Sequence, residues 1–432
     1  MPVSTPATPT LRARLETAWD HSDRLFEWLE PRALLERPIR LRQPFLFYLG
    51  HLPAFAWNQL GRAAFGHASV RPGFDTLFER GIDPPDTQDD AGDDAGAWPR
   101  LDEVLAYRDA VRRALRPLLH DPALAAAAAM TFEHELMHHE TLLYMMLRLP
   151  HGLKRPPREL PPFVFEGAAP ATRVSVPAGL AQLGAGPGTL PFGWDNEFPA
   201  CEVAVPEFRI DTTAVRNGQF LEFVRAGGYE DRRLWSEEAW RWTQRRSQRT
   251  PPFWNTAPDG WSCRTLFSDV PLERVLDWPV YVSWAEANAY ARLNGGRLPT
   301  EAEYHRAAYG AGAGAPPLHP WGDEPPAGER GNFGLRHFAP TPVGCHPAGA
   351  SAWGIQDLVG NGWEWTSSVF APFPGFEAHR GYAGYSADFF DGRHYVLKGA
   401  SWATDDQLLR RSFRNWFQPH YPHVFSQFRT VG

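Results

Sequence analysis

Residues 131–149 read TFEHELMHHETLLYMMLRL, with three histidines and two glutamates inside seven positions, followed by an apolar run. The segment contains no glycine or proline and follows five consecutive alanines, so it predicts one long helix. On a helix, His134 and His138 share a face, where two imidazoles can hold one metal ion. His139 is turned about 100° away and is not expected to be a ligand.

Other interpretations of this stretch remain open. Histidines four residues apart also occur on the solvent-facing side of an amphipathic helix. The letters HELMH satisfy the HExxH pattern of zinc peptidases, with Glu135 as general base, although no third ligand follows at the usual spacing. His51 lies inside an apolar segment and is a candidate third ligand, but a lone histidine there is more often a buried structural residue.

The rest of the N-terminal half is also helical in pattern. Apolar residues recur near the 3.6-residue period over 11–29, and the segments 45–65 and 101–119 are helix-like. Pro53 indicates a helix start or a kink. With the histidine-bearing helix these segments predict a four-helix bundle, whose inward side chains can build a metal site. The acidic stretch 83–99 lacks the EF-hand order and predicts a solvated loop.

A proline-rich stretch divides the chain. We expect a helical metal-binding domain over 1–155, a linker over 156–170 and an α+β domain over 171–432. In the last of these, short β-like runs alternate with loops, and helices are expected after the caps Ser283 and Thr300. The β-like runs are 172–177, 201–211 and 279–284.

Composition excludes several classes of protein. The formal net charge of −7 offers no basic footprint for nucleic acid. The three cysteines are far apart and form no CxxC, which favours a reducing cytoplasm over a disulfide framework. The sequence has no apolar signal region and no run of 18 apolar residues. We therefore expect a cytoplasmic protein, a monomer or weak homodimer, with small-molecule substrates and no membrane partner.

Two long motifs resemble a known fold. Residues 281–308 (YVSWAEANAYARLNGGRLPTEAEYHRAA) and 353–367 (WGIQDLVGNGWEWTS) are similar to the formylglycine-generating-enzyme fold, which is of the C-type-lectin-like kind. Segments 192–199, 213–224 and 397–429 resemble the same fold. Enzymes of this fold that oxidise cysteine rely on a late cysteine pair. Since this chain has no such pair, a formylglycine-generating role is not expected.

The N-terminal half resembles the DinB-type bundle. The two domains in this order resemble the non-haem iron sulfoxide synthases of ergothioneine and ovothiol biosynthesis. The resemblance implies that His51, His134 and His138 hold the metal. It also implies that Glu140, or else Glu135, accepts the far N–H of a ligand histidine and fixes its tautomer.

Three neutral imidazoles would leave Fe(II) with open positions for a thiolate or selenolate and for O₂. Zinc binds imidazole but has no redox chemistry. The resemblance thus implies an iron-dependent oxidoreductase that couples sulfur or selenium to an imidazole carbon of hercynine, with O₂ as co-substrate. FYLGH (47–51) and HETLLYM (139–145) are most similar to the ovothiol-type, fungal ergothioneine-type and selenoneine synthase branches.

The family's RN-aromatic element corresponds to Arg414, Asn415 and Trp416. The resemblance implies that this element binds the histidine-derived substrate, with Asn415 bonding an imidazole nitrogen and an aromatic surface attracting the trimethylammonium group of hercynine. Tyr385, and less so Tyr382, are candidate proton donors within GYAGYSADFF.

The chain departs from the bacterial ergothioneine synthases that use γ-glutamylcysteine. Phe417 and Tyr421 stand where those enzymes commonly have aspartate and arginine, and Met137 stands where a glutamine is frequent. A less charged donor is therefore expected, and we favour a selenosugar, as in selenoneine synthases. The alternatives are an ergothioneine-type synthase using cysteine or γ-glutamylcysteine, a zinc HExxH hydrolase, and a non-catalytic binding protein.

Overall fold

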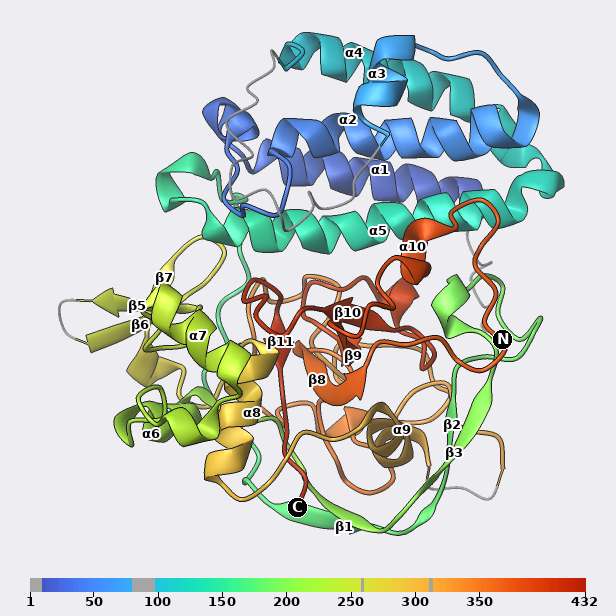
Figure 1. Cartoon of the computed structure of the whole chain (residues 1–432). Helices are drawn as coiled ribbons and strands as arrows, with labels where there is room; N and C mark the ends of the chain where they lie inside the picture. Colours follow the sequence, from blue (N-terminus) through green and yellow to red (C-terminus); the bar gives the residue numbers. More distant parts are fainter. Residues whose placement is uncertain (1–9, 80–97, 258–259, 311–313) are drawn as a thin grey trace, which may run out of the picture. The chain divides into compact units, whose positions relative to one another are not determined.

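A computed structural model describes residues 10–79, 98–257, 260–310 and 314–432. The chain forms two compact units, Met1–Pro157 and Arg158–Gly432, drawn together in Figure 1. The first is helical and the second mixes helices with short strands, which confirms the predicted two-domain α+β organisation. No helix in the described ranges is both long and apolar enough to cross a bilayer.

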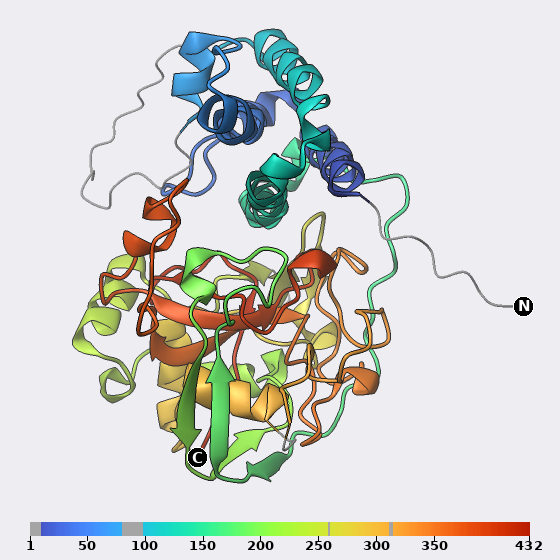
Figure 2. The same ribbon diagram turned by 90° about the vertical axis from the view of Figure 1, so that its right-hand side faces the viewer.

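The first unit is built on four long helices. They are α1 (Leu11–Glu27), α2 (Phe45–Ala56), α4 (Leu101–Leu115) and α5 (Ala125–Arg148), with the short α3 (Pro72–Leu77) between α2 and α4. Helix α1 packs against α5, and α2 packs against both α4 and α5. Figure 2 shows the four long helices nearly end on. The predicted bundle is confirmed, with α5 its longest helix.

Helix α2 runs through Pro53 and continues into a π-helical turn at Trp57–Ala63, so Pro53 does not start a new helix. The missing N–H of Pro53 removes one helical hydrogen bond but does not end the helix, because every residue of α2 is buried by its neighbours. Gly50 lies against the ring of Phe78, and a Cβ at Gly50 would stand 2.6 Å from that ring. Close packing at this glycine therefore sets the position of α2 beside the segment that follows α3.

The second unit is organised around a four-stranded sheet in the order β10-β9-β8-β11. The β8–β9 and β9–β10 pairs are antiparallel, and β11 lies parallel to β8. Smaller sheets pair β1 with β4, β2 with β3, and β6 with both β5 and β7. The strands are β1 (Arg173–Val176), β2 (Gly179–Leu183), β3 (Cys201–Val205), β4 (Phe208–Asp211), β5 (Trp254–Ala257), β6 (Gly260–Arg264), β7 (Asp269–Pro271), β8 (Gly362–Val369), β9 (Tyr395–Ala400), β10 (Asn415–Phe417) and β11 (Ser426–Gln427).

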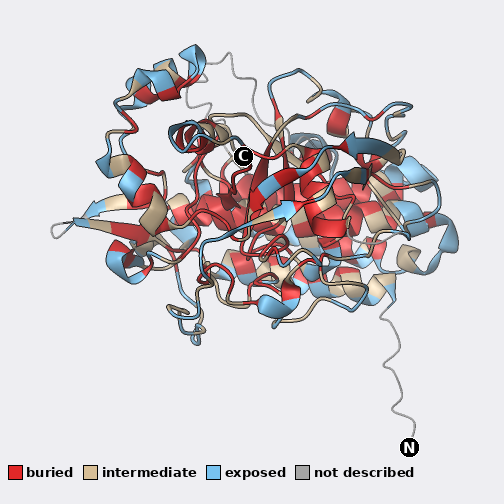
Figure 3. Ribbon diagram, turned by 90° about the horizontal axis from the view of Figure 1, so that it is seen from below, coloured by how far each residue is buried: buried red, intermediate tan, exposed pale blue. Residues whose placement is uncertain are grey.

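The helices of the second unit are α6 (Asn217–Arg225), α7 (Glu237–Arg246), α8 (Trp284–Leu293), α9 (Glu301–Tyr309) and α10 (Gly384–Ala387). Ser283 and Thr300 cap α8 and α9, as predicted. Each helix also has a glutamate at its third position that completes a capping box. Helix α9 packs on β2, β3, β8 and β9. Figure 3 colours the ribbon by burial, with buried residues concentrated in the interior and exposed ones on the outer segments.

One strand prediction is wrong. Residues 279–283 form no strand beyond an isolated bridge at Pro279, and Trp284 already begins α8. The backbone bonds of the segment go to different partners: Val280 N–H to the Val215 carbonyl and Val282 N–H to the Ser426 carbonyl. The segment therefore bridges two separate parts of the second unit instead of pairing with one strand. Most of the acidic stretch 83–99 lies outside the described residues.

Candidate functional site

Three histidine side chains converge inside the first unit. His51 comes from α2, and His134 and His138 come from one face of α5. The Nε2 atom of His134 lies 3.3 Å from Nε2 of His51 and 3.2 Å from Nε2 of His138. His51 and His134 are buried and His138 is partly buried. The fold thus joins residues that are 83 positions apart in the chain.

The protonation of this cluster favours lone pairs at its centre. The Nδ1 atom of His51 lies 2.8 Å from the carbonyl oxygen of Phe78, which can only accept, so Nδ1 carries the proton and Nε2 carries the lone pair. Burial lowers the pKa of His51 to about 4. Burial, together with the neighbouring imidazoles, holds the pKa values of His134 and His138 well below the usual range. The three rings are therefore neutral at pH 7.

Aromatic side chains fix the orientation of these rings. Phe55 stacks on His134 with the ring centroids 3.6 Å apart. Phe47 stacks on His51 at 5.2 Å. Such packing restricts the imidazoles to the orientations in which their Nε2 atoms meet.

The cluster fits a nitrogen-ligated transition metal. Within the described ranges, it is the one group of histidine, cysteine, aspartate and glutamate residues whose ligand atoms all lie within 4.8 Å of one another. When three neutral imidazoles each turn an Nε2 lone pair toward the others, no hydrogen lies between them to form a hydrogen bond. A metal cation at their centre would accept all three lone pairs. Imidazole is a good ligand for iron, copper, nickel and zinc.

In the second unit, strand β10 carries the predicted substrate residues. Asn415, Trp416 and Phe417 pair with Leu397, Val396 and Tyr395 of β9, and all three are partly exposed. They stand at the edge of the four-stranded sheet.

Trp416 belongs to an aromatic set. Its ring stacks on Phe370 with centroids 4.2 Å apart and meets the edge of Tyr385 at 5.4 Å. Tyr385 stacks on Trp194 at 3.9 Å and lies 5.6 Å from Tyr382. The set therefore joins four segments distant in sequence around one tryptophan.

Phe417 and Tyr421 also pack together. Their rings are stacked at 5.0 Å and nearly parallel. Phe417 is partly exposed and Tyr421 is buried behind it, so the two positions where the sequence departs from the charged pattern carry no charge of their own.

Comparisons with known proteins agree with both halves. Residues 14–148 match the DinB superfamily, and residues 164–432 match the sulfatase-modifying factor enzyme 1-like domain. The hercynine oxygenase of Mycolicibacterium smegmatis is 41% identical over 309 residues, covering 70% of this chain and 71% of that protein. The ergothioneine biosynthesis protein 1 of Neurospora crassa is 30% identical over 512 residues, covering 98% of this chain and 58% of that protein.

The chain belongs to the ergothioneine-type sulfoxide synthase family. It is accordingly an oxidoreductase-type enzyme. Among solved structures, PvdO from Pseudomonas aeruginosa matches with a TM-score of 0.41 and 19% identity, covering 60% of this chain and 93% of that one.

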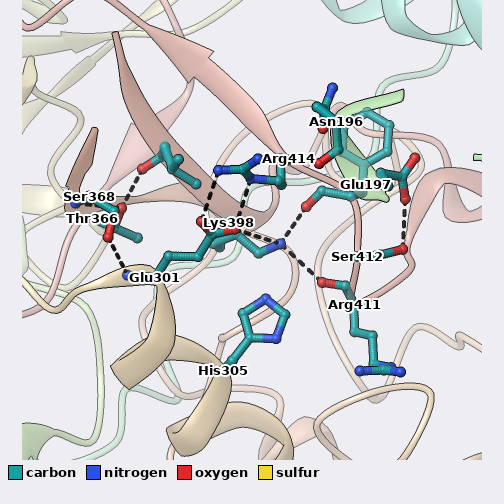
Figure 4. Close-up of polar contacts among 12 residues, drawn as sticks. Asn196, Glu197, Glu301, His305, Thr366, Ser368, Lys398, Arg411, Ser412 and Arg414 are labelled. Carbon is teal, nitrogen blue, oxygen red and sulfur yellow. Dashed lines mark hydrogen bonds and ion pairs between the residues drawn. The ribbon is translucent and has the colours of Figure 1, made fainter. Parts of the chain in front are cut away.

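Arg414 of the synthase has a place different from the one expected. It is 3% exposed, and its guanidinium pairs with Glu301, with Nε 3.0 Å from Oε1. It also donates to the carbonyls of Asn196 and Ala371, at 3.2 and 3.1 Å, and Figure 4 shows it directed into this polar network. Because these donors are used inside the unit, Arg414 supports β10 instead of contacting substrate.

The same network holds the chain just before β10. Lys398 is buried on β9, and its Nζ donates to the carbonyls of Arg411 and Phe413, at 3.0 and 2.6 Å. Its Nζ also lies 3.8 Å from Glu301. Glu301, at the first position of α9, therefore serves two buried cations, and nothing in the sequence pattern assigned it a role.

One orienting partner of a ligand histidine differs from expectation, while the orienting role of Glu140 stays a prediction. The far nitrogen of His51 is taken by the Phe78 carbonyl and not by a carboxylate. Glu135 accepts the hydroxyl of Ser22 from α1. Glu140 is buried and Met137 is partly buried on the same helix. For Nδ1 of His138, the described part of the chain offers no hydrogen-bond partner.

Trp194, Phe370 and Ser22 were not singled out from the sequence. The motif FGWDNEFP marked the segment that carries Trp194, but not its contact with Tyr385, which lies on a distant loop. Long-range aromatic contacts leave no periodic signal in a single sequence.

Proposed function

We propose that this synthase is a non-haem Fe(II)- and O₂-dependent enzyme that forms a C–Se or C–S bond at an imidazole carbon of hercynine, with a selenosugar as the preferred donor. The observation that carries the proposal is the convergence of three neutral imidazole Nε2 atoms in a buried bundle. Family membership gives that geometry a chemical context.

His51, His134 and His138 would hold the metal. Iron bound there would supply one-electron and O₂ chemistry that zinc lacks. Because the three ligands carry no charge, the metal would keep its full positive charge and favour an anionic thiolate or selenolate. The protein's own part is to keep the imidazoles neutral by burial and, for His51, to fix the tautomer through the Phe78 carbonyl.

Asn415 and Trp416 would recognise the imidazole substrate. The Oδ1 atom of Asn415 already accepts the backbone N–H of Trp416 at 2.9 Å, which leaves its amide hydrogens to donate to an imidazole nitrogen. The aromatic set would attract the trimethylammonium group by cation–π interaction. The names of the relatives favour this substrate, since one is a hercynine oxygenase and another an ergothioneine biosynthesis protein.

Tyr385 is our candidate proton donor, and Tyr382 the second choice. The hydroxyl of Tyr385 is carried by a ring that stacks on Trp194 and makes an edge-on contact with Trp416. A ring fixed by two such contacts presents its hydroxyl in one direction, as positioned acid catalysis requires.

The donor preference rests on Phe417 and Tyr421. A stacked, uncharged pair offers no cationic partner for the carboxylates of γ-glutamylcysteine, whereas a sugar ring can lie against an aromatic face. The second candidate function is an ergothioneine-type synthase using cysteine or γ-glutamylcysteine, and the names of the relatives favour it. A zinc HExxH hydrolase is less well supported, since Glu135 is engaged by Ser22 and is 2% exposed.

The test is anaerobic reconstitution with Fe(II), followed by aerobic assay with hercynine. A selenosugar, cysteine and γ-glutamylcysteine are offered in parallel, and products are identified by mass. Product from the selenosugar alone supports the proposal. Product from a thiol alone moves the enzyme to the ergothioneine branch, and no product despite bound iron contradicts the hercynine assignment.

A double variant sharpens the donor test. Phe417→Asp with Tyr421→Arg restores the two charges, so it should raise the use of γ-glutamylcysteine relative to the selenosugar. Leu180→Asp with Leu293→Arg is the matched control, because it adds the same two charges at exposed positions of the same unit. An unchanged donor ratio in the double variant would contradict the role of this pair.

A further inference from the structure

A second buried polar cluster lies in the bundle, beside the three histidines but made from other residues. Ser22 of α1 donates its hydroxyl to Oε1 of Glu135 on α5. The same Oγ lies 2.8 Å from Nε2 of His139, one helical turn further along α5. Ser22, Glu135 and His139 are each 2% exposed, so these contacts are shielded from water.

This cluster has a fixed geometric relation to the candidate ligands. Glu135 and His139 each follow a ligand histidine by one residue, so the two pairs stand about 100° apart around the axis of α5 at nearly the same height. A contact from α1 that holds one pair therefore sets the direction in which the other pair points.

The third ligand makes that direction important. His51 comes from α2, so the 3.3 Å separation between Nε2 of His51 and Nε2 of His134 depends on how α5 is rotated. At a radius of about 5–6 Å, a rotation of about 10° moves a side-chain tip by about 1 Å. Metal–ligand distances tolerate only about 0.2 Å, so a small rotation would disturb a site built from two helices.

Helix α1 is itself braced against a third helix. Asp23, next to Ser22, pairs with Arg108 and Arg112 of α4, at 2.9 and 2.7 Å. His21 lies on the other side of Ser22 and packs on His139 with ring centroids 4.5 Å apart. Ser22 is therefore a fixed point, not a mobile side chain that follows α5.

We propose that Ser22 is a positioning residue of the metal centre, which sets the rotation of α5, and so the direction of His134 and His138, by holding Glu135 and His139. The inference rests on the metal centre of the proposed function. One hydroxyl suffices for both contacts, because it has one proton to donate and two lone pairs to accept. Neither Ser22 nor its partners need touch the metal.

The test uses the full chain and Co²⁺ as the probe, because the visible spectrum of bound Co²⁺ reports ligand geometry. Ser22→Ala should weaken Co²⁺ binding by about tenfold or more, the loss expected when an orienting partner of a metal site is removed, and should change the spectrum. Ser22→Thr keeps the hydroxyl and should retain the spectrum. Ser22→Cys keeps the size with a weaker donor, and it covers the case in which the alanine variant does not fold.

Tyr107→Phe is the matched control. It removes a buried hydrogen bond of the same bundle, from Tyr107 to Asp75 at 2.6 Å, without touching α5. It should lower the melting temperature while leaving the Co²⁺ spectrum unchanged, so a general loss of stability is separated from a loss of positioning. Wild-type affinity and spectrum in folded Ser22→Ala or Ser22→Cys would overturn the inference alone. A wild-type chain that binds no Co²⁺ or Fe(II) would overturn the proposed function as well.

Discussion

The histidine cluster of α2 and α5 and the strand β10 were both expected to carry function, but they differ in how their motif residues point. In the cluster, all three histidines direct Nε2 to one place. On β10 the motif divides: Asn415 and Trp416 are partly exposed, while Arg414, just before the strand, is buried against Glu301. A spacing of four residues on a helix fixes a shared direction. The residues 414–416 instead cross from a buried segment into an edge strand, so their surroundings change from one residue to the next.

Both regions nevertheless depend on a buried anchor outside the motif. His51 is oriented by the carbonyl of Phe78, and Arg414 is held by the carboxylate of Glu301. The anchors explain why a motif alone does not identify which residues act and which support.

Acidification should separate the two regions most strongly. Burial lowers the pKa values of His21 and His51 to about 4, so the stability that they contribute is complete above the unfolded value of about 6.5 and is lost as pH falls toward 4. At pH 5 each costs the metal-free bundle about 2 kcal/mol, and Glu135, whose pKa is raised, offsets part of this. Among the described residues, burial also holds the pKa values of His134, His138 and His139 well below the usual range in the first unit, but in the second unit it lowers only the pKa of His305 that far. Hydrogen exchange of the metal-free chain should therefore show the first unit opening before the second, and equal loss in both would contradict it.

Glu301→Gln should act on the second unit alone. It removes the negative charge from a buried pair and leaves Arg414 and Lys398 uncompensated, which we expect to cost about 3 kcal/mol in unfolding free energy. Iron binding should remain at one equivalent. Glu273→Gln provides a control at an exposed glutamate of the same unit. If folded Glu301→Gln lost its iron, the claim that the polar network of the second unit acts independently of the histidine cluster would be contradicted.

Gly50→Ala should act on the first unit alone. The added Cβ would stand 2.6 Å from the Phe78 ring, forcing away the residue whose carbonyl orients His51. Iron affinity should fall about 10–100-fold, as for other orienting partners of metal sites. Gly73→Ala tests the same substitution at a glycine with open space around it. Unchanged affinity in Gly50→Ala would show that the carbonyl contact does not set the ligand.

Trp416→Leu should have the smallest effect. It keeps apolar volume but removes the ring, so the KM for hercynine should rise by about 2–30-fold, matching a cation–π contribution of about 0.5–2 kcal/mol. Steady-state kinetics of the iron-loaded enzyme measures this, with Trp240→Leu on α7 as a tryptophan control. A change in kcat without a change in KM would assign Trp416 to a step other than hercynine binding.

The sequence predicted the bundle, the two capped helices of the second unit and the shared face of His134 and His138, because each depends on local periodicity or capping. Only the family resemblance identified His51 as a metal ligand, because its position in the sequence has no regular spacing from His134 and His138. The direction of Arg414 was not predictable, because it depends on Glu301 113 residues earlier. For the same reason the segment 279–284 has the composition of a strand yet joins no ladder.

The most direct test of the metal centre is an anaerobic Fe(II) titration of the wild-type chain, His51→Ala and the control His67→Ala, an exposed histidine of the same unit. Our account predicts one equivalent of iron for the wild type and His67→Ala, and no stoichiometric binding for His51→Ala. Wild-type affinity in His51→Ala would contradict the three-histidine centre and favour a metal held by the HELMH segment alone.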